Sequence, residues 1–300
     1  MTGGTGTRRM LDLRRAQEPA LVTTDWLAAH LDAPDVRIMD ASWHLPTSGR
    51  DALSEYRAAH VPGALFFDIE TIADQDLPLP HMAPPPELFA SRMRQLGVGD
   101  GHKVIVYDSG DLPSAPRAWW TFRLMGHGDV AVLDGGLKKW RREGRPLTDL
   151  VPEFGERHFT ARFQAPLVAD IARVKAALRD PEIQIVDARP ADRFAGKAPE
   201  PRAQLPSGHI PGSRNLPYSE LYAADGTLLP VDLLRERATC HGIDPLKPTI
   251  ATCGSGITAC TIALAFHLLG NEEVAVFDGA WCAWGSDPDN PVATGETGEG

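Results

Sequence analysis

The stretch Gly270–Ala280, GNEEVAVFDGA, matches the earlier stretch Gly126–Gly136, GHGDVAVLDGG. Each copy holds a short apolar, β-branched run that ends at Asp-Gly, a pattern typical of a buried strand followed by a turn. The copies lie 270 − 126 = 144 residues apart in a chain of 300. A repeat at this distance predicts two copies of one domain.

Two further pairs of segments support the duplication. VRIMDAS (Val36–Ser42) matches IQIVDAR (Ile183–Arg189), and HVPGA (His60–Ala64) matches HIPGS (His209–Ser213). Their offsets are 183 − 36 = 147 and 209 − 60 = 149 residues. The small differences between offsets predict loops of unequal length on a shared scaffold.

Strands and helices alternate in each half. The expected helices include Asp25–Leu31, Pro86–Leu96, Ile171–Leu178 and Val231–Ala238, and the expected last strands are Val130–Leu133 and Val274–Phe277. Such alternation predicts an α/β protein of two tandem domains, each a mostly parallel sheet with helices on both faces. We expect a disordered leader (1–19), a first domain (20–147), a linker (148–166) and a second domain (167–295).

The composition limits the classes of function. The chain has 30 Lys and Arg against 40 Asp and Glu, a formal charge of −10, which argues against bulk nucleic-acid binding. No apolar run approaches the roughly 18–20 residues that span a bilayer. The four arginines between Arg8 and Arg15 precede no apolar stretch, so no secretory signal is expected. We therefore expect a cytoplasmic protein without a membrane partner.

The cysteines gather in the last quarter of the chain. They are Cys240, Cys253, Cys260 and Cys282, without C-x-x-C pairs or neighbouring histidines at metal-ligand spacing. This pattern predicts reduced thiols and no metal site. Cys260 falls within an apolar helix and Cys282 beside a tryptophan, so both are expected to be packing residues.

Cys253 lies where a strand gives way to a helix. PTIAT (Pro248–Thr252) predicts a strand, and the apolar run Thr258–Leu269 predicts a helix ended by Gly270. Between them stands a loop of small residues. N–H groups at a helix start have no partner within the helix and can bind an anion. A thiol held there ionises more easily, so Cys253 is predicted to be a nucleophile.

The first half differs at this point. It has YDSGDLPSAP (Tyr107–Pro116), with Asp108 or Ser109 at the cysteine position, depending on a one-residue choice of alignment. Its two prolines, Pro113 and Pro116, are expected to prevent the same anion cradle. The sequence therefore places function in the second half, with the first half in support.

These residues resemble the tandem rhodanese-domain sulfurtransferases over roughly Leu21–Gly295. The loop CGSGIT (Cys253–Thr258) is similar to that of members that use 3-mercaptopyruvate, which usually have Val at the position of Ile257. Members that use thiosulfate typically carry Arg and Lys directly after the cysteine, where this chain has Gly254 and Ser255. Thiosulfate is a dianion and gains from charged donors, whereas a neutral loop suits a donor whose charge lies further away.

The resemblance implies roles for further residues. Arg193 and Arg202 match the two arginines that hold the carboxylate and carbonyl of 3-mercaptopyruvate. Ser255, His81 and Glu70 match a proposed proton relay in which the family has Asp rather than Glu. Backbone N–H groups of the loop residues Gly254, Gly256, Ile257 and Thr258 would stabilise the sulfur anion.

The reaction implied by the resemblance has two halves. Cys253 takes sulfur from 3-mercaptopyruvate as a persulfide and pyruvate is released; a thiol such as reduced thioredoxin, or cyanide, then accepts the sulfur. No metal or organic cofactor is implied. The alternative donor is thiosulfate. A cysteine phosphatase is disfavoured because position 259 is Ala rather than Arg, and a non-enzymatic sulfur carrier because both arginines are present.

Overall fold

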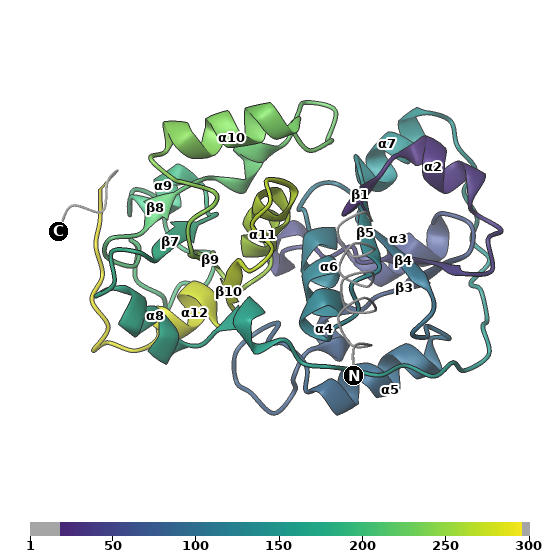
Figure 1. Cartoon of the computed structure of the whole chain (residues 1–300), viewed down its shortest axis with the longest axis horizontal. Helices are drawn as coiled ribbons and strands as arrows, with labels where there is room; N and C mark the ends of the chain where they lie inside the picture. The colour runs from purple at the N-terminus through teal and green to yellow at the C-terminus, as the bar shows by residue number, and fades with distance from the viewer. Residues whose placement is uncertain (1–18, 296–300) are drawn as a thin grey trace, which may run out of the picture.

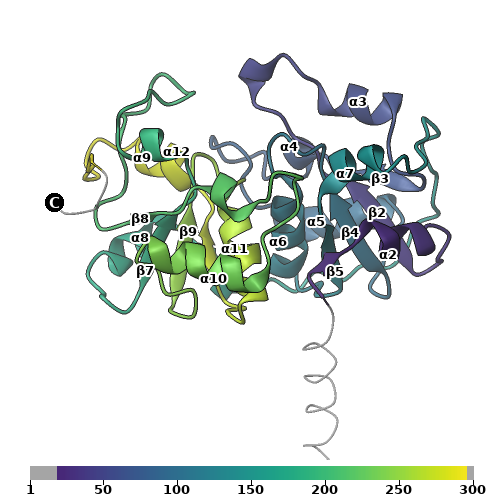
Figure 2. The same ribbon diagram turned by 90° about the horizontal axis from the view of Figure 1, so that it is seen from above.

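The computed structural model describes residues 19–295, which form two similar halves lying side by side (Figure 1, Figure 2). All but one residue of the expected leader 1–19 lies outside the described part. Each half contains a five-stranded sheet, with strand orders β1-β5-β4-β2-β3 and β6-β10-β9-β7-β8. Every pair of neighbouring strands is parallel. The predicted duplicated α/β fold is confirmed.

The strands of the two sheets correspond one to one. The first sheet holds β1 (Leu21–Val22), β2 (Val36–Asp40), β3 (Ala64–Phe66), β4 (Lys103–Tyr107) and β5 (Val130–Leu133). The second holds β6 (Val168–Ala169), β7 (Gln184–Asp187), β8 (Arg214–Asn215), β9 (Thr249–Thr252) and β10 (Ala275–Phe277). The two-residue edge strands β1 and β6 were not predicted, because a strand this short carries no periodicity.

Helices cover both faces of each sheet. In the first half they are α2 (Thr24–Ala29), α3 (Ala52–Ala58), α4 (Ile69–Ile72), α5 (Pro86–Gln95), α6 (Ala115–Leu124) and α7 (Gly136–Arg142). In the second they are α8 (Ile171–Ala177), α9 (Ala191–Phe194), α10 (Val231–Cys240), α11 (Ala259–Leu268) and α12 (Ala280–Trp284). Short 3₁₀ turns are η1 (Pro46–Ser48), η2 (Ala165–Leu167) and η3 (Tyr218–Leu221).

Local sequence explains several helix starts. Thr23 caps α2 by accepting the N–H of Trp26 at 3.1 Å, and Asp170 caps α8 by accepting the N–H of Arg173 at 2.8 Å. Such side chains satisfy donors that have no partner within the helix. The α2 helix starts one residue earlier and ends two residues earlier than expected, at Thr24 and Ala29.

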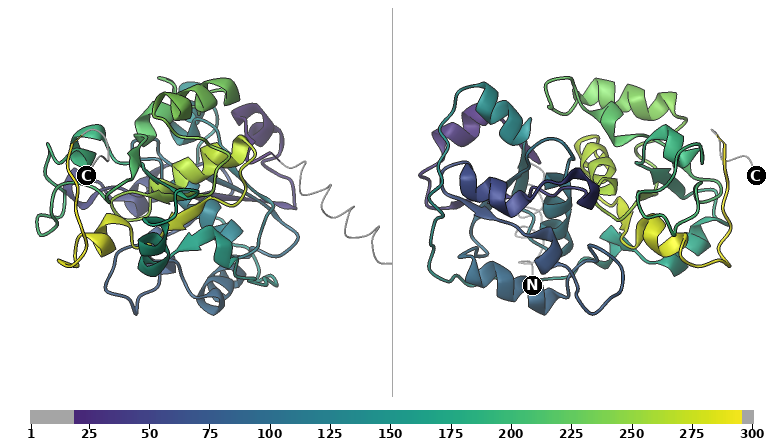
Figure 3. Two further views of the ribbon diagram at one scale, coloured as in Figure 1. Left: turned by 60° about the vertical axis from the view of Figure 1, so that its left-hand side comes forward. Right: turned by 180° about the vertical axis from the view of Figure 1, so that it is seen from behind.

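The central strands are apolar on both faces. In β4, Ile105 packs in a core with α2 and α7, whereas Val104 and Val106 face a second core with α5 and α6. Burial of both faces accounts for continuous apolar runs rather than alternation. The core that contains Val104 and Val106 continues into the second half, because α6 and α11 pack against each other where the two halves meet (Figure 1, Figure 3).

The repeated Asp-Gly pair joins the two halves. Asp134 after β5 accepts the N–H of Leu228 from the second half at 2.8 Å. Asp278 after β10 accepts the N–H of Ala83 from the first half at 2.6 Å. These two bonds are equivalent under the internal repeat, so each sheet end is tied to a loop of the other half.

The segment between the sheets packs on the first half. It contains no helix or strand from 149 to 164. Phe159 is fully buried against Phe89 and Phe122, and Phe154 lies under the Arg37 guanidinium at 4.3 Å. The segment expected as a linker is therefore partly core in its own right.

Candidate active site

Cys253 lies directly after β9, at the carboxyl end of the second sheet, and is 2% exposed. Its carbonyl accepts the N–H of Trp281 at 3.0 Å, and the Gly254 carbonyl accepts the N–H of Cys282 at 3.0 Å. The start of α12 therefore holds the start of the cysteine loop. In parallel α/β sheets this end is where ligands bind.

The loop keeps its N–H groups available. In the described part of the chain, none of the backbone N–H groups from Gly254 to Thr258 donates a hydrogen bond. Unused donors before a helix can stabilise a sulfur anion. Two further thiols lie near the loop, and burial raises the pKa of Cys260 to about 12 and also raises that of Cys282. They remain protonated, as expected of packing residues.

Gly256 makes the turn of this loop possible. Its φ is +80°, and a Cβ there would lie 2.8 Å from the Asp278 carbonyl oxygen. Gly256→Ala is expected to lower stability by about 1–2 kcal/mol through the left-handed backbone alone, and to reduce kcat at least about tenfold by shifting the loop. Thermal unfolding and initial rates measure both effects.

Gly254→Ala is the matched control for that change. A Cβ at Gly254 would meet only the end of the Arg193 side chain, at 3.1 Å, and its φ is not left-handed. We expect this variant to keep its stability. Equal stability of the two variants would contradict a special backbone requirement at Gly256.

The strand register decides what replaces the cysteine in the first half. Asp187 pairs with Thr252 in the second sheet, and Asp40 pairs with Tyr107 in the first. Asp108, rather than Ser109, therefore corresponds to Cys253. The Asp108 carbonyl also accepts the N–H of Leu137 at 2.8 Å, just as Cys253 accepts that of Trp281.

An anion cradle does exist in the first half, contrary to the expectation from Pro113 and Pro116. The Asp108 carboxylate accepts the N–H groups of Gly110, Ser114 and Ala115 at 2.8–2.9 Å. The prolines do not prevent the cradle, because the donors come from other residues of the loop. The cradle is occupied by the protein's own side chain.

Asp108 gives a pH-dependent prediction. Burial raises its pKa to about 6, against the opposing effect of the three N–H donors. Because this folded pKa exceeds the ordinary value of about 3.9, the folded protein binds more protons than the unfolded chain between these pH values, and stability falls as pH rises. The free energy of unfolding of the parent, relative to Asp108→Asn, should fall by about 2–3 kcal/mol from pH 4 to 7.

Urea unfolding of both proteins across this pH range measures the effect. Asn cannot ionise, so its variant lacks this contribution, although it loses acceptor capacity at every pH. A difference between the two proteins that stays constant with pH would contradict the raised pKa of Asp108.

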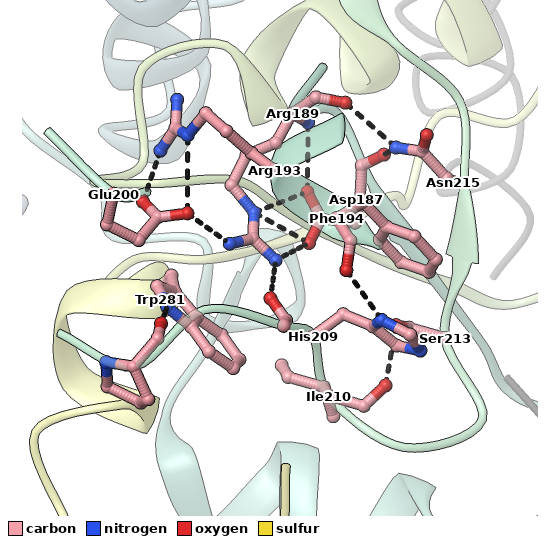
Figure 4. Close-up of polar contacts among 12 residues, drawn as sticks. Asp187, Arg189, Arg193, Phe194, Glu200, His209, Ile210, Ser213, Asn215 and Trp281 are labelled. Carbon is pink, nitrogen blue, oxygen red and sulfur yellow. Dashed lines mark hydrogen bonds and ion pairs between the residues drawn. The ribbon is translucent and has the colours of Figure 1, made fainter. Parts of the chain in front are cut away.

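Arg193 belongs to a chain of four charges (Figure 4). Its guanidinium pairs with Glu200, which also accepts from Arg189 at 2.8 Å, and Arg189 in turn pairs with Asp187 at 2.6 Å. Arg189, Glu200 and Asp187 are buried, whereas the Arg193 side chain is 21% exposed. This network of ion pairs holds Arg193 beside Gly254, with the Arg193 charge already paired to Glu200.

Arg202 has a different environment. Within the described residues its guanidinium forms no ion pair or hydrogen bond, and it is half-buried. Its charge acts on the Glu70 carboxyl and on the thiol of Cys282, the residue whose backbone N–H donates to the cysteine loop at Gly254. Of the two arginines, Arg193 and Arg202, it is therefore Arg202 whose guanidinium is available to an anionic ligand.

His81 and Glu70 are brought together by the first half. His81 Nδ1 lies 3.4 Å from Glu70 Oε2, and Trp43 Nε1 donates to Glu70 Oε1 at 2.7 Å. The neighbouring His81 holds the pKa of the Glu70 carboxyl below its usual range, with burial opposing and Trp43 assisting. The longer Glu side chain therefore still reaches the histidine. Within the described residues, no hydrogen bond joins Ser255 to His81.

Arg117 was not predicted and lies at the centre of the site. It reaches from α6 to the Gly256 carbonyl at 3.2 Å, to the His81 carbonyl and to Asp278 at 2.7 Å. Its partners are 36 to 161 residues away in sequence (117 − 81 and 278 − 117), so no local pattern signals it. Only the repeat offers a hint, because the Asp of the repeated Asp-Gly pair is its ion partner.

Residues 19–295 contain no group of three or more His, Cys, Asp or Glu side chains arranged to hold a metal ion. No helix in that range has the length and apolar character needed to cross a membrane.

Known proteins resemble this chain over most of its length. The Rhodanese-like domain family matches residues 23–143 and 170–287. The 3-mercaptopyruvate sulfurtransferase of Escherichia coli is 44% identical over 272 residues, 90% of this chain and 96% of that protein. The thiosulfate sulfurtransferase of Bos taurus is 41% identical over 289 residues, 93% of this chain and 97% of that protein. The crystal structure of SseA from Escherichia coli, a protein with the rhodanese fold, has a TM-score of 0.80 and 43% identity, covering 88% of this chain and 99% of that one.

Two parallel sheets, with a cysteine loop at the carboxyl end of the second, define a two-domain rhodanese-like protein. Both halves match the domain, and the identities exceed 40% over nearly complete chains. The chain belongs to the rhodanese family and is a sulfurtransferase.

Proposed function

We propose that this enzyme transfers the sulfur of 3-mercaptopyruvate to Cys253 and then to a thiol acceptor, releasing pyruvate. One observation carries the proposal: Cys253 is buried in an uncharged loop, and Arg202, whose charge acts on the neighbouring Cys282, has no carboxylate partner in the described residues. A carboxylate on the donor would supply that partner.

Overall identity does not separate the possible donors. A relative named for 3-mercaptopyruvate and one named for thiosulfate are 44% and 41% identical to this chain. The loop supports the first donor, because Gly254 and Ser255 offer no charged group to a dianion next to the sulfur. Thiosulfate is the second candidate, supported by the cattle relative.

The first half-reaction begins with the Cys253 thiolate attacking the sulfur of the donor. A sulfur–sulfur bond forms and the carbon–sulfur bond breaks, leaving its electron pair on the carbon as the enolate of pyruvate. Arg202 binds the donor carboxylate, with Arg193 beside Gly254 orienting the carbonyl. The free N–H groups of Gly254, Gly256, Ile257 and Thr258 stabilise the negative charge on sulfur in the thiolate and in the persulfide.

A proton must then reach the enolate carbon. His81, held by Glu70, is the proposed proton donor, with Ser255 as the intermediate group. In the second half-reaction a thiol such as that of reduced thioredoxin attacks the outer sulfur and regenerates the Cys253 thiolate. Four unpaired cysteines support action in the cytoplasm.

We further propose that the division of the chain follows the two sheets. Residues 20–147 form the supporting domain, 148–166 the connection and 167–295 the catalytic domain. The domain matches at 23–143 and 170–287 are compatible with these bounds.

Initial rates with 3-mercaptopyruvate and with thiosulfate, each with cyanide as acceptor, test the donor. We expect kcat/KM for 3-mercaptopyruvate to exceed that for thiosulfate by at least about tenfold. The carboxylate of 3-mercaptopyruvate can pair with Arg202, whereas the thiosulfate dianion gains from charged donors that this loop does not have. An equal or larger value for thiosulfate would overturn the proposal.

A further inference from the structure

Arg117 carries a buried charge between the two halves. It lies in the first turn of α6, is 2% exposed, and stacks over the Trp120 ring at 4.5 Å. A buried guanidinium is stable only with a close partner of opposite charge. Asp278 of the second half supplies it at 2.7 Å and is itself 4% exposed.

The other guanidinium donors go to two backbone carbonyls of the active site. One is that of Gly256 in the cysteine loop, at 3.2 Å, and the other is that of His81 in the first half. Both residues have a left-handed backbone, with φ of +80° and +60°. Such a conformation is unfavourable for His81 and persists only where the surroundings hold it.

The bond to Gly256 also orients the loop. The C=O and N–H of one trans peptide point in opposite directions. Arg117 and the Cys260 thiol both donate to the Gly256 carbonyl oxygen, the thiol at 3.3 Å. The peptide bond between Gly256 and Ile257 is thereby oriented, so that the Ile257 N–H points away from Arg117 and toward the inside of the loop. The bond to His81 likewise fixes the backbone that carries the imidazole beside Glu70.

The residue that corresponds to Arg117 in the second half distinguishes a role in the active site from a role in general packing. The helices α6 and α11 begin at equivalent residues, Ala115 and Ala259, so the counterpart of Arg117 at the same offset of 144 is Thr261. The second half therefore has Thr261, and no arginine, at the equivalent place in α11. The arginine is present only on the side that faces the cysteine loop.

We propose that Arg117 is a positioning residue that couples the two halves of the active site, aiming the loop N–H groups at Cys253 and holding His81 in register with them. The inference deepens the proposed function and rests on Cys253 being the sulfur acceptor. It does not depend on which donor is used. The Arg117–Asp278 ion pair fixes the Arg117 guanidinium in this position across the domain boundary.

The experiment compares Arg117→Met and Arg117→Lys with the parent enzyme. Lys keeps a charge opposite Asp278 but cannot bond both carbonyls. The measurements are kcat per alkylatable Cys253, KM, and the rate of Cys253 alkylation by iodoacetamide as a function of pH. We expect kcat per site to fall about 100-fold in the Met variant and about tenfold in the Lys variant, with KM changed less than about threefold. The midpoint of the alkylation profile should move to higher pH in both.

Arg37→Met is the matched control. Arg37 is also buried, stacks over a ring and donates to backbone carbonyls, of Gly97 at 3.2 Å and Val36 at 2.8 Å, but it lies away from the cysteine loop. It should lower thermal stability and leave the alkylation midpoint and kcat per site unchanged.

An unchanged alkylation midpoint and kcat per site in Arg117→Lys would overturn the inference, whether or not the Met variant folds. A parent enzyme that turns over only thiosulfate would instead refute the proposed donor. Alkylation requires no donor, so that result would leave the test of Arg117 intact.

Discussion

Replacement of Cys253 by serine is expected to abolish sulfur transfer, with kcat reduced by at least about 10⁴-fold for every donor. A serine hydroxyl has a far higher pKa than a thiol and its oxygen cannot carry the transferred sulfur. Serine is similar in size, and the loop is held through backbone bonds from α12, so the fold should be retained. Initial rates with 3-mercaptopyruvate and cyanide, together with thermal unfolding, measure both properties.

Cys240→Ser is the control for that variant, because Cys240 is exposed on α10. It should retain full activity. Cys260 and Cys282 remain present in the Cys253 variant, and burial keeps their pKa values raised, so neither should replace the nucleophile. Turnover by Cys253→Ser above the background rate would mean that another thiol accepts the sulfur.

Arg202→Gln is expected to lower kcat/KM for 3-mercaptopyruvate by about 10- to 100-fold, the value of one charge-assisted hydrogen bond to a carboxylate. Activity with thiosulfate, which has no carboxylate, should change much less. Since Arg202 has no ion partner in the described part of the chain, its loss leaves no buried charge unpaired. Thermal unfolding should therefore be unaffected.

Arg193→Gln provides the contrast. It removes one of the two partners of the buried Glu200, so it should lower stability as well as activity. Arg235→Gln, on the exposed face of α10, should change neither. An unaltered ratio of the two donor activities in Arg202→Gln would remove Arg202 from the proposed donor site.

Sequence patterns predicted what depends on neighbours along the chain. The repeated strand and Asp-Gly turn predicted two like sheets, because burial on both faces imposes the same apolar run wherever it occurs. The strand, small-residue loop and apolar helix around Cys253 predicted a thiol at a sheet end. The edge strands β1 and β6 were missed because two residues carry too little pattern.

Other features depend on contacts between distant segments. The choice between Asp108 and Ser109 required the strand register, which comes from hydrogen bonds between β2 and β4. The cradle around Asp108 was also unforeseen, since its donors come from a loop whose prolines suggested the opposite. Glu70 could be judged only once its distance to His81 was known.

By itself, the sequence determined that one fold occurs twice and that one copy carries a cysteine in a loop without charged side chains. These properties follow from periodicity and from residue types within a few positions of each other. The tertiary structure decided how the halves share a single site. Arg117, Asp278 and His81 come together from segments far apart in the sequence, and a buried charge there is stable only when its partner is supplied from the other half.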